Sequence, residues 1–212
     1  MPPSPTPESC YVYLLRHGAT DNNLANPPIL QGNTVDGPLS EEGKRQAELA
    51  AKGLAHQQLE AVYSSPLLRA RQTAEIVAHP HELNVGIVPE ISEVDVGSWE
   101  GRSWVEIERT EPDFYRRFMD DPAQNGYRDG ESLMDVRDRV VPALDKLLRQ
   151  NQGKRIAIVA HNVVNRVYLA MAAKMPLAHA RSISQENCGI NVLRYRDGEL
   201  KLISMNSVLH LW

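Results

Sequence analysis

The chain is poor in cysteine and has no long apolar run. Its 212 residues include 2 cysteines, Cys10 and Cys188, which lie far apart in the sequence. Two distant thiols do not make a disulfide framework, so we expect free cysteines in a reducing compartment, which places the protein in the cytoplasm. No stretch approaches the length of a membrane-spanning helix, so we expect no membrane partner.

Neither sign of charge is in large excess. The sequence holds 23 Lys and Arg residues against 27 Asp and Glu residues, a formal net charge of −4. Nucleic-acid-binding domains usually carry a basic stripe or a net basic charge, so we expect no nucleic-acid partner. Any site for an anion must then be a local cluster of arginines. The hydrophobic share of 42% is ordinary for a globular domain that buries a core without disulfides.

Residues 1–9 are rich in proline and lack the basic and apolar regions of a signal peptide. We expect a disordered lead-in over these residues. Residues 10–212 have the length of one α/β domain and contain no internal repeat or linker.

Apolar runs rich in β-branched and aromatic residues alternate with amphipathic segments along the chain. This alternation is typical of an α/β fold with a largely parallel sheet. The last two strands are joined by Arg196-Asp197-Gly198, which predicts a hairpin at the sheet edge. Strands are expected at residues 11–15, 61–64, 86–89, 155–160, 190–195 and 200–205, and helices at 40–56, 66–78, 132–150 and 162–173.

The segment over residues 95–130 differs from its surroundings. It places Trp99, Trp104, Phe114 and Phe118 among many charged residues. We expect a helical excursion over the top of the sheet. Two interpretations stay open, because such a segment can be a lid over a site or a surface helical subdomain that only packs.

An apolar run over residues 11–15 breaks abruptly into Arg16-His17-Gly18. In open α/β sheets, ligands bind at the carboxyl ends of strands, where these residues would lie. Arginine can bind phosphate through two parallel hydrogen bonds, and histidine can act as a nucleophile or carry a proton. Gly18 lets the backbone approach a ligand closely. Such a tripeptide also arises by chance at a polar strand end, so other segments must supply partners.

A second histidine has matching surroundings. The apolar run 156–160 ends in His161, and a helix is expected to start at Asn162. Because the carboxyl ends of parallel strands meet at one edge of a sheet, His17 and His161 can face each other across one pocket. A lone histidine is more often structural, whereas two in matched positions favour a shared site.

Two further segments follow strands in the same way. Arg69 falls in the first turn of the helix after strand 61–64, where its charge opposes the helix dipole and calls for an anion partner. Glu93 follows the third strand and is the carboxylate best placed to reach the pocket. Asp95 and Glu100 are expected to be solvated or structural.

Taken in order, these motifs resemble those of the histidine phosphatase superfamily, in the branch of the cofactor-dependent phosphoglycerate mutases and acid-phosphatase-like enzymes. Four motifs in the right order are specific, whereas any one alone would not be. The resemblance implies a three-layer sandwich with a mostly parallel central sheet, helices on both faces, and a phosphohistidine mechanism without metal or cofactor. The matching residues are Arg16-His17-Gly18-x-Thr20, Ser65-Pro66-x-x-Arg69-Ala70-x-Gln72-Thr73-Ala74, Glu93-x-x-x-Gly97-x-Trp99-Glu100-Gly101 and His161.

The resemblance gives each catalytic residue a chemical role. His17 is expected to attack phosphorus, and the neighbouring Arg16 and Arg69 favour its neutral form. These arginines and His161 are expected to hold the phosphate oxygens as charge redistributes. Glu93 is expected to give a proton to the leaving alkoxide and later to take one from water, because a carboxyl beside a phosphate dianion keeps its proton.

Further residues are expected to contact the substrate, which would be a small phosphorylated metabolite. Family habit leaves a homodimer open. The expected substrate-binding residues are Gly18, Thr20, Asn23, Gln31, Gly32 and Asn162.

The sequence departs from the family pattern at three points. Asn22 stands where an aromatic residue is frequent, and Ile29-Leu30 stand where a basic residue often precedes Gln31-Gly32. That loop normally contacts substrate, so its apolar character argues against a multiply anionic substrate. Asn162 replaces the usual glycine after the second histidine, and as a good helix cap it is expected to preserve the anion site.

Three functions are open. The first is a phosphatase for a small phosphomonoester, and the second is a phosphoglycerate mutase that hands the phosphoryl group back to a sugar acid. Mutases of the family carry a longer insertion after the segment equivalent to Trp99-Glu100-Gly101, and its absence here favours hydrolysis. The third is a catalytically idle phosphate-binding scaffold, which is disfavoured because the catalytic positions are all filled.

Overall fold

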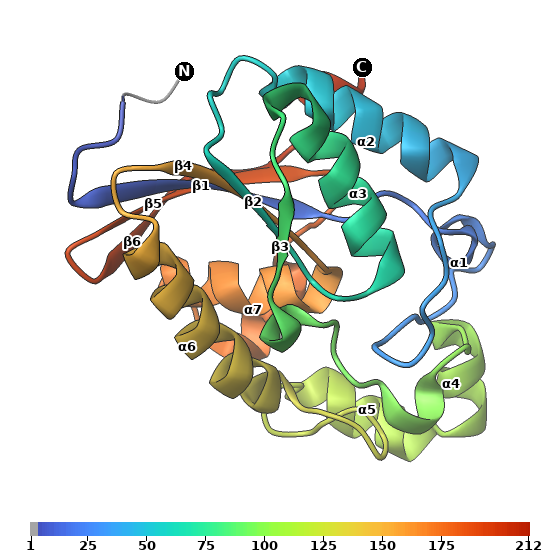
Figure 1. The fold of residues 1–212 in the computed structure, drawn as a ribbon. Helices are drawn as coiled ribbons and strands as arrows, with labels where there is room; N and C mark the ends of the chain where they lie inside the picture. Colours follow the sequence, from blue (N-terminus) through green and yellow to red (C-terminus); the bar gives the residue numbers. More distant parts are fainter. Residues whose placement is uncertain (1–3) are drawn as a thin grey trace.

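A computed structural model describes residues 4–212 and places a six-stranded sheet at the centre of the molecule (Figure 1). The strand order is β3-β2-β4-β1-β5-β6. The first four of these run parallel, and β5 runs antiparallel to both β1 and β6. The strands are β1 (Ser9–Arg16), β2 (Ala61–Ser64), β3 (Val85–Ile87), β4 (Arg155–Ala160), β5 (Ile190–Arg196) and β6 (Glu199–Ser207). The expected mostly parallel α/β sheet and its edge hairpin are confirmed.

Helices cover both faces of the sheet, as Figure 1 shows. Alternate residues of the buried strand β1 serve the two layers: Val12 and Leu14 pack with α6 (Leu133–Gln150) and α7 (Asn162–Ala172). Tyr13 and Leu15 pack with α2 (Glu41–Leu54) and α3 (Leu68–Ala78). This two-residue alternation follows from the pleat of a strand and gives each layer its own apolar core.

Local capping explains where several helices begin. The Ser40 hydroxyl accepts the backbone N–H of Gly43 at the start of α2, and Ser132 and Asp135 form a reciprocal capping box at the start of α6. The helix expected from residue 66 instead begins at Leu68 and has no side-chain cap. A short helix, α1 (Asp21–Leu24), was not expected; Thr20 and Asn23 cap it reciprocally.

The amino-terminal boundary differs from the expectation. Ser9 is already part of β1, and its backbone N–H donates to the carbonyl of Thr6 at 2.9 Å. The expectation of a disordered lead-in over residues 1–9 is therefore wrong at Ser9, which is a residue of β1 and is tied to Thr6 by this hydrogen bond. Residues 1–3 of that lead-in lie outside the described part of the chain. Among residues 4–212, no helix combines the length and apolar character needed to cross a membrane.

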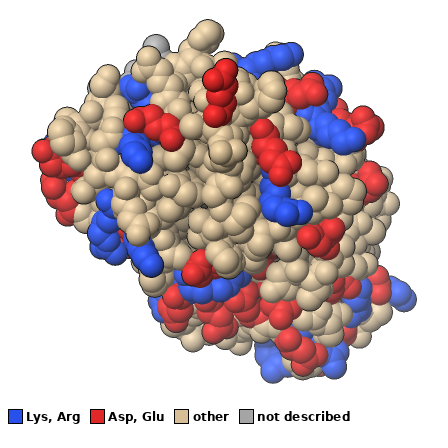
Figure 2. Space-filling model, in the orientation of Figure 1, with Lys and Arg blue, Asp and Glu red and all other residues tan. Residues whose placement is uncertain are grey.

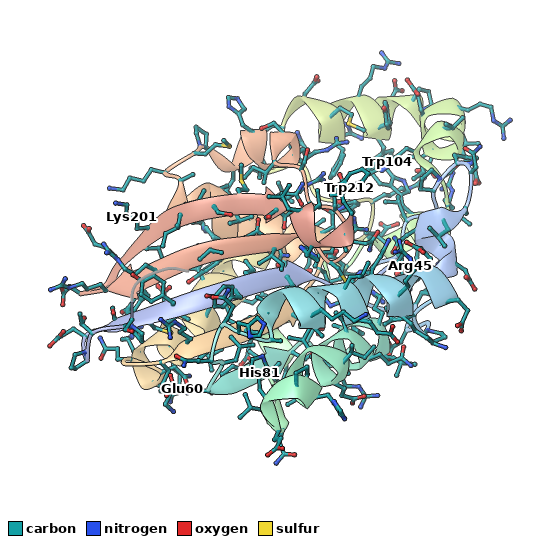
Figure 3. The ribbon with its side chains drawn as sticks, turned by 90° about the horizontal axis from the view of Figure 1, so that it is seen from above. Arg45, Glu60, His81, Trp104, Lys201 and Trp212 are labelled. Carbon is teal, nitrogen blue, oxygen red and sulfur yellow. The ribbon has the colours of Figure 1, made fainter. Side chains whose placement is uncertain are left out.

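The segment over residues 95–130 forms α4 (Trp104–Thr110) and α5 (Pro112–Asp120) beyond the ends of the parallel strands. Figure 3 shows Trp104 at the opposite end of the molecule from Glu60, which precedes β2. Trp99 is fully buried, with edge-on ring contacts to Trp104 and Phe118 at centroid distances of 5.8 and 5.5 Å. These aromatic side chains extend the core that β1 shares with α6 and α7. A role as a moving lid stays a prediction.

Charged side chains of both signs are mixed over the surface. Figure 2 shows them scattered across the sheet-covering helices and crowded together near α4 and α5, with no wide basic patch on the face displayed. The acidic and basic residues of the 95–130 segment pair with one another: Glu111 accepts ion pairs from both Arg102 and Arg128.

Candidate active site

A cavity of about 180 Å³ opens at the carboxyl ends of β1 and β4, the edge where ligands bind in open α/β sheets. The 95–130 segment forms one wall through Trp104 and Tyr127. The loop before Gln31 forms another, and the start of α7 forms the floor. Its charged and polar lining includes Arg16, His17, Glu93, Asn162, Arg166 and Arg181.

His17 directly follows β1 and is almost entirely buried. Its Nδ1 lies 2.7 Å from the carbonyl oxygen of Gly18, and because a carbonyl only accepts, Nδ1 must carry the proton. The lone pair is therefore on Nε2. Burial, followed by the charges of Arg69 and Arg16, holds the pKa of His17 well below its ordinary value. The imidazole is neutral at neutral pH and ready to act as a nucleophile.

His161 ends the run of β4 and occupies the N-cap position of α7. Its ring centroid lies 5.2 Å from that of His17, so the two strand-end histidines are neighbours, but His161 is fully buried and only His17 is part of the cavity lining. Nε2 is 2.7 Å from the hydroxyl oxygen of Ser65, whereas the buried Nδ1 has no hydrogen-bond partner. Burial, with the charges of Arg69, His17 and Arg16, lowers the pKa of His161 well below its ordinary value.

The two predicted arginines behave differently. Arg16 lines the cavity; its Nη1 donates to the carbonyl of Gln185 at 2.8 Å, and its buried Nε has no partner. Burial lowers the pKa of Arg16 to about 10, which still leaves it charged at neutral pH. Arg69 is fully buried behind the cavity wall, and its two Nη atoms donate to the carbonyls of Gly32 and Val35, each at 2.8 Å. The anion partner expected for this first-turn arginine is thus replaced by two carbonyl oxygens.

Glu93 lines the cavity and is held at the amino end of α7. Its Oε2 accepts the backbone N–H of Val163 at 3.2 Å, and its Oε1 accepts those of Val94 at 2.9 Å and Val164 at 3.4 Å. A carboxylate at a helix amino end is favoured by the helix dipole. Glu100, in contrast, accepts the N–H of Gly32 and the hydroxyl of Thr34, so its structural role is confirmed.

Arg139 of α6 fixes the loop that carries Glu93. Its guanidinium donates to the backbone carbonyls of Glu90, Ser92 and Glu93 at 2.6, 2.9 and 3.1 Å. The same group pairs with both carboxylate oxygens of Glu131 at 2.7 and 2.9 Å. The position of Glu93 therefore depends on a residue that does not touch the cavity.

Of the expected substrate-binding residues, Asn23, Gln31 and Asn162 line the cavity. Asn162 is the first residue of α7 and not its cap, because His161 takes the cap position. The buried Oδ1 of Asn162 has no partner. The expectation that it caps the helix was wrong, although it does face the site.

Gly18, Thr20 and Gly32 are not part of the cavity lining. The Gly18 N–H donates to the Thr73 hydroxyl, and a Cβ atom at Gly18 would lie 2.4 Å from the carbonyl oxygen of Gly43. Glycine is thus required here by the close approach of α2. Thr20 caps α1, and its hydroxyl donates a hydrogen bond to the side-chain oxygen of Gln31. The backbone carbonyl of Gly32 accepts from Arg69, and its N–H donates to Glu100. These three residues shape the loops around the site.

Sequence reasoning assigned no role to four residues that contribute to the site: Ser65, Tyr127, Arg166 and Arg181. Ser65 belongs to a motif that matches the superfamily, but its sequence context does not show its contact with His161. Arg166 follows Asn162 by four positions in the same helix, so helical spacing could have placed it on the cavity side. Arg181 comes from the 3₁₀ segment Leu177–Ser182, which has no recognisable pattern. Among residues 4–212, no group of three or more His, Cys, Asp or Glu side chains is arranged to hold a metal ion.

The profile of the histidine phosphatase superfamily (branch 1) matches residues 12–208. The chain belongs to this superfamily. Several curated superfamily proteins are similar over most of their length. Phosphoserine phosphatase 1 of Hydrogenobacter thermophilus is 29% identical over 198 residues, which cover 93% of this chain and 92% of that protein. A metal-independent phosphoserine phosphatase of Arabidopsis thaliana is 32% identical over 210 residues, with coverages of 94% and 82%.

A protein named probable phosphoglycerate mutase GpmB, from Serratia proteamaculans, is 30% identical over 180 residues, with coverages of 85% and 82%. Solved structures agree with the superfamily fold. YhfR of Bacillus stearothermophilus superposes with a TM-score of 0.88 at 28% identity and covers 96% of this chain and 100% of its own. Phosphoserine phosphatase of Entamoeba histolytica, solved with 3-phosphoglyceric acid, gives a TM-score of 0.84 at 28% identity and the same coverages.

Proposed function

We propose that this protein hydrolyses a small phosphomonoester through a phosphohistidine on His17, without a metal ion. The observation that carries the proposal is the hydrogen bond from His17 Nδ1 to the Gly18 carbonyl. It leaves the Nε2 lone pair on a buried, neutral imidazole beside two arginines. A nucleophile in a cationic pocket suits attack on a phosphate dianion. The names of the superfamily relatives, which include phosphoserine phosphatases, support hydrolysis.

In the first step, Nε2 of His17 forms a bond to phosphorus while the bond from phosphorus to the ester oxygen breaks. The leaving alkoxide takes a proton from Glu93, which is held in the cavity by the N–H groups of α7 and keeps that proton because the bound phosphate dianion lies beside it. We assign the phosphoryl oxygens to Arg16, which lines the cavity, and to the unpartnered Nδ1 of His161, whose ring lies beside that of His17. Arg69 contributes its charge from behind the wall.

In the second step, water attacks phosphorus and the bond to Nε2 breaks. Glu93, now a carboxylate, takes a proton from that water, and phosphate leaves. The imidazole of His17 returns to its starting neutral tautomer, so each turnover consumes one ester and one water and needs no further reactant.

The short connection between Gly101 and α4 favours hydrolysis over the phosphoglycerate mutase reaction. Helix α4 begins at Trp104, three residues after Gly101, so no longer insertion stands between Gly101 and α4. A mutase must shield its phosphohistidine from water until the acceptor returns. Because some relatives are named probable phosphoglycerate mutases, the mutase reaction is the second candidate function and is included in the experiment below.

The decisive experiment uses one enzyme preparation treated with chelator. It measures turnover of p-nitrophenyl phosphate and the acid-labile phosphoryl group that becomes attached to the enzyme. We expect both the turnover and this phosphoryl label to persist in chelator. H17N should lose both, with a rate loss of at least about 1,000-fold, or roughly 4 kcal/mol. The exposed His79 supplies the control, because H79N leaves the cavity untouched. Label that persists in H17N, or turnover that requires an added divalent ion, would contradict the proposal. Phosphoryl return to a sugar acid at the expense of free phosphate would favour the mutase.

We further propose that the protein works in the cytoplasm on a small phosphorylated metabolite. Cys10 and Cys188 are both free and buried, as expected for thiols in a reducing compartment. The small cavity suits a metabolite better than a macromolecule.

A further inference from the structure

Two of the arginines that line the cavity form no ion pair with an acidic side chain in the described part of the chain. Arg166 comes from α7 and Arg181 from the 3₁₀ segment Leu177–Ser182, and both are only partly exposed. In the described part of the chain, the ion pairs within 4.0 Å include neither of them. Most surface arginines near this segment, such as Arg102 and Arg128, are paired with a carboxylate.

The two charges act on each other. Burial, the largest effect, lowers the pKa of Arg166, and the positive charge of Arg181 lowers it further, whereas Tyr127, Glu93 and Glu186 raise it without cancelling the shift. Two neighbouring cations without a counterion are costly in a partly buried site. Such a pair is stabilised when an anion enters the cavity between them.

Both guanidinium groups are held in place by their surroundings. Arg166 donates from Nε to the carbonyl of Ile183 at 2.8 Å. Its two Nη atoms have no hydrogen-bond partner among the described residues and can donate to a ligand. Arg181 lies over the rings of Trp104 and Phe118, at 5.1 and 5.2 Å from their centroids, and contacts the sulfur of Met119. Stacked and anchored arginines lose little entropy on binding, so they are suited to recognise a carboxylate through paired hydrogen bonds.

The pair reaches the cavity from other elements than the residues proposed to hold the phosphoryl group. Arg16 and His17 line the cavity from the end of β1, whereas Arg166 and Arg181 line it from α7 and the 3₁₀ segment Leu177–Ser182. The cavity is small, and its lining also includes apolar residues such as Leu30, Val94 and Val163. A short carbon chain with an anion at its far end fits a cavity with this lining.

We infer that the substrate is a phosphomonoester whose leaving alcohol carries a carboxylate bound by Arg166 and Arg181. This inference rests on the phosphomonoesterase proposed above. It revises the expectation drawn from the apolar Ile29-Leu30 loop, which argued against a multiply anionic substrate, because the cations come from α7 and the 3₁₀ segment Leu177–Ser182 instead of from that loop. A carboxylate is favoured over a second phosphate because the cavity is small and the planar guanidinium groups match a planar anion.

The test compares O-phosphoserine with O-phosphoethanolamine, which differ only by the carboxylate. We expect the wild type to prefer phosphoserine in kcat/KM by about 10- to 100-fold, as for the loss of a charged hydrogen bond. R166M and R181M should each remove most of that preference, chiefly through a higher KM for phosphoserine. R181K should retain part of it. Arg116, on the exposed face of α5, gives the matched control R116M, for which the ratio should not change.

Binding to the H17N variant gives a second readout that needs no turnover. Phosphoserine should bind more tightly than phosphoethanolamine by a similar factor, and R166M or R181M in that background should remove the difference. Equal kcat/KM for the two esters, or a preference that survives in both arginine variants, would overturn the inference while leaving hydrolysis intact. A stronger preference for 1,3-propanediol bisphosphate, lost in the same variants, would replace the carboxylate with a second phosphate. Failure to turn over p-nitrophenyl phosphate would instead refute the proposed function.

Discussion

Nε2 of His161 lies 2.7 Å from the hydroxyl oxygen of Ser65, a residue 96 positions earlier in the chain. When the hydroxyl donates to Nε2, the proton of the neutral imidazole sits on Nδ1 and can donate to a phosphoryl oxygen. We predict that S65A lowers kcat by roughly 10-fold, the usual scale of one positioning hydrogen bond. S65T keeps the hydroxyl and should restore much of the rate. An unchanged kcat in S65A would mean that the ring needs no such support.

Glu93 gives a test that depends on the leaving group. A proton donor matters for an alkoxide and barely matters for nitrophenolate. We predict that E93Q slows hydrolysis of an alkyl phosphate far more than that of p-nitrophenyl phosphate. If water attack then limits turnover, stopped-flow measurements will record a burst of nitrophenol. Equal, modest losses on both esters without a burst would exclude Glu93 as the acid.

Arg139 holds the backbone of residues 90–93 through three carbonyl oxygens, so it positions Glu93 without contacting substrate. We predict that R139M reproduces the leaving-group dependence of E93Q in weaker form, with a larger loss for the alkyl ester. R137M, on the same helix, removes only a bond to Asp138 and serves as the control. A uniform loss on both esters, matched by a lower Tm, would assign Arg139 a purely structural role.

The buried histidine pair makes stability depend on pH. Burial holds the pKa of both His17 and His161 below their ordinary value of 6.5, so the unfolded chain binds protons that the folded chain refuses. Above pH 6.5 both histidines are uncharged in the folded and in the unfolded chain, so they do not make the free energy of unfolding depend on pH. Below pH 6.5 the free energy of unfolding falls as the pH drops, by up to about 1.4 kcal/mol per pH unit for each histidine. Urea unfolding at pH 7.5, 6.5 and 5.5 should therefore give a flatter profile for H17N/H161N than for the wild type. The exposed pair H56N/H79N should follow the wild type; identical profiles for all three would refute the prediction.

The backbone of Ala19, two residues after His17, lies so close to α2 that position 43 must be a glycine. A Cβ atom at Gly43 would lie 2.0 Å from the carbonyl oxygen of Ala19, a backbone atom that cannot move without displacing the residues around His17. We predict that G43A costs about 2–4 kcal/mol in the free energy of unfolding and lowers kcat as well. G53A, in the same helix, meets only the side chain of His210 and should be nearly neutral. A stable, fully active G43A would contradict this account.

The sequence predicted the parts of the site that follow a local pattern. His17 and His161 stand where apolar strands end, and parallel topology brings strand ends together, so their proximity could be foreseen. Glu93 was chosen among nearby carboxylates by motif spacing, and its place in the cavity agrees. The fold class followed from the same alternation of strands and helices.

The remaining parts depend on contacts that no local pattern encodes. Arg69 donates its hydrogen bonds to the carbonyls of Gly32 and Val35, which lie more than thirty positions earlier in the chain. Gly18 is small because of Gly43 and not because of a ligand. Arg181 reaches the cavity from an irregular segment whose position is set by packing on Trp104 and Phe118. Such long-range choices are decided by tertiary packing, which overrides local propensity.

The strand that carries the nucleophile has a neighbour on each side, and both come from the far end of the chain. β1 pairs with β4 and β5, so Ser9–Arg16 is synthesised well before residues 155–196 can join it. While the chain emerges from the ribosome, this apolar strand has two unpaired edges, the kind of surface that recruits other chains. Nascent or truncated chains that stop before β5 should consequently be inactive and prone to aggregate, and recovery of activity on refolding should report completion of the whole sheet.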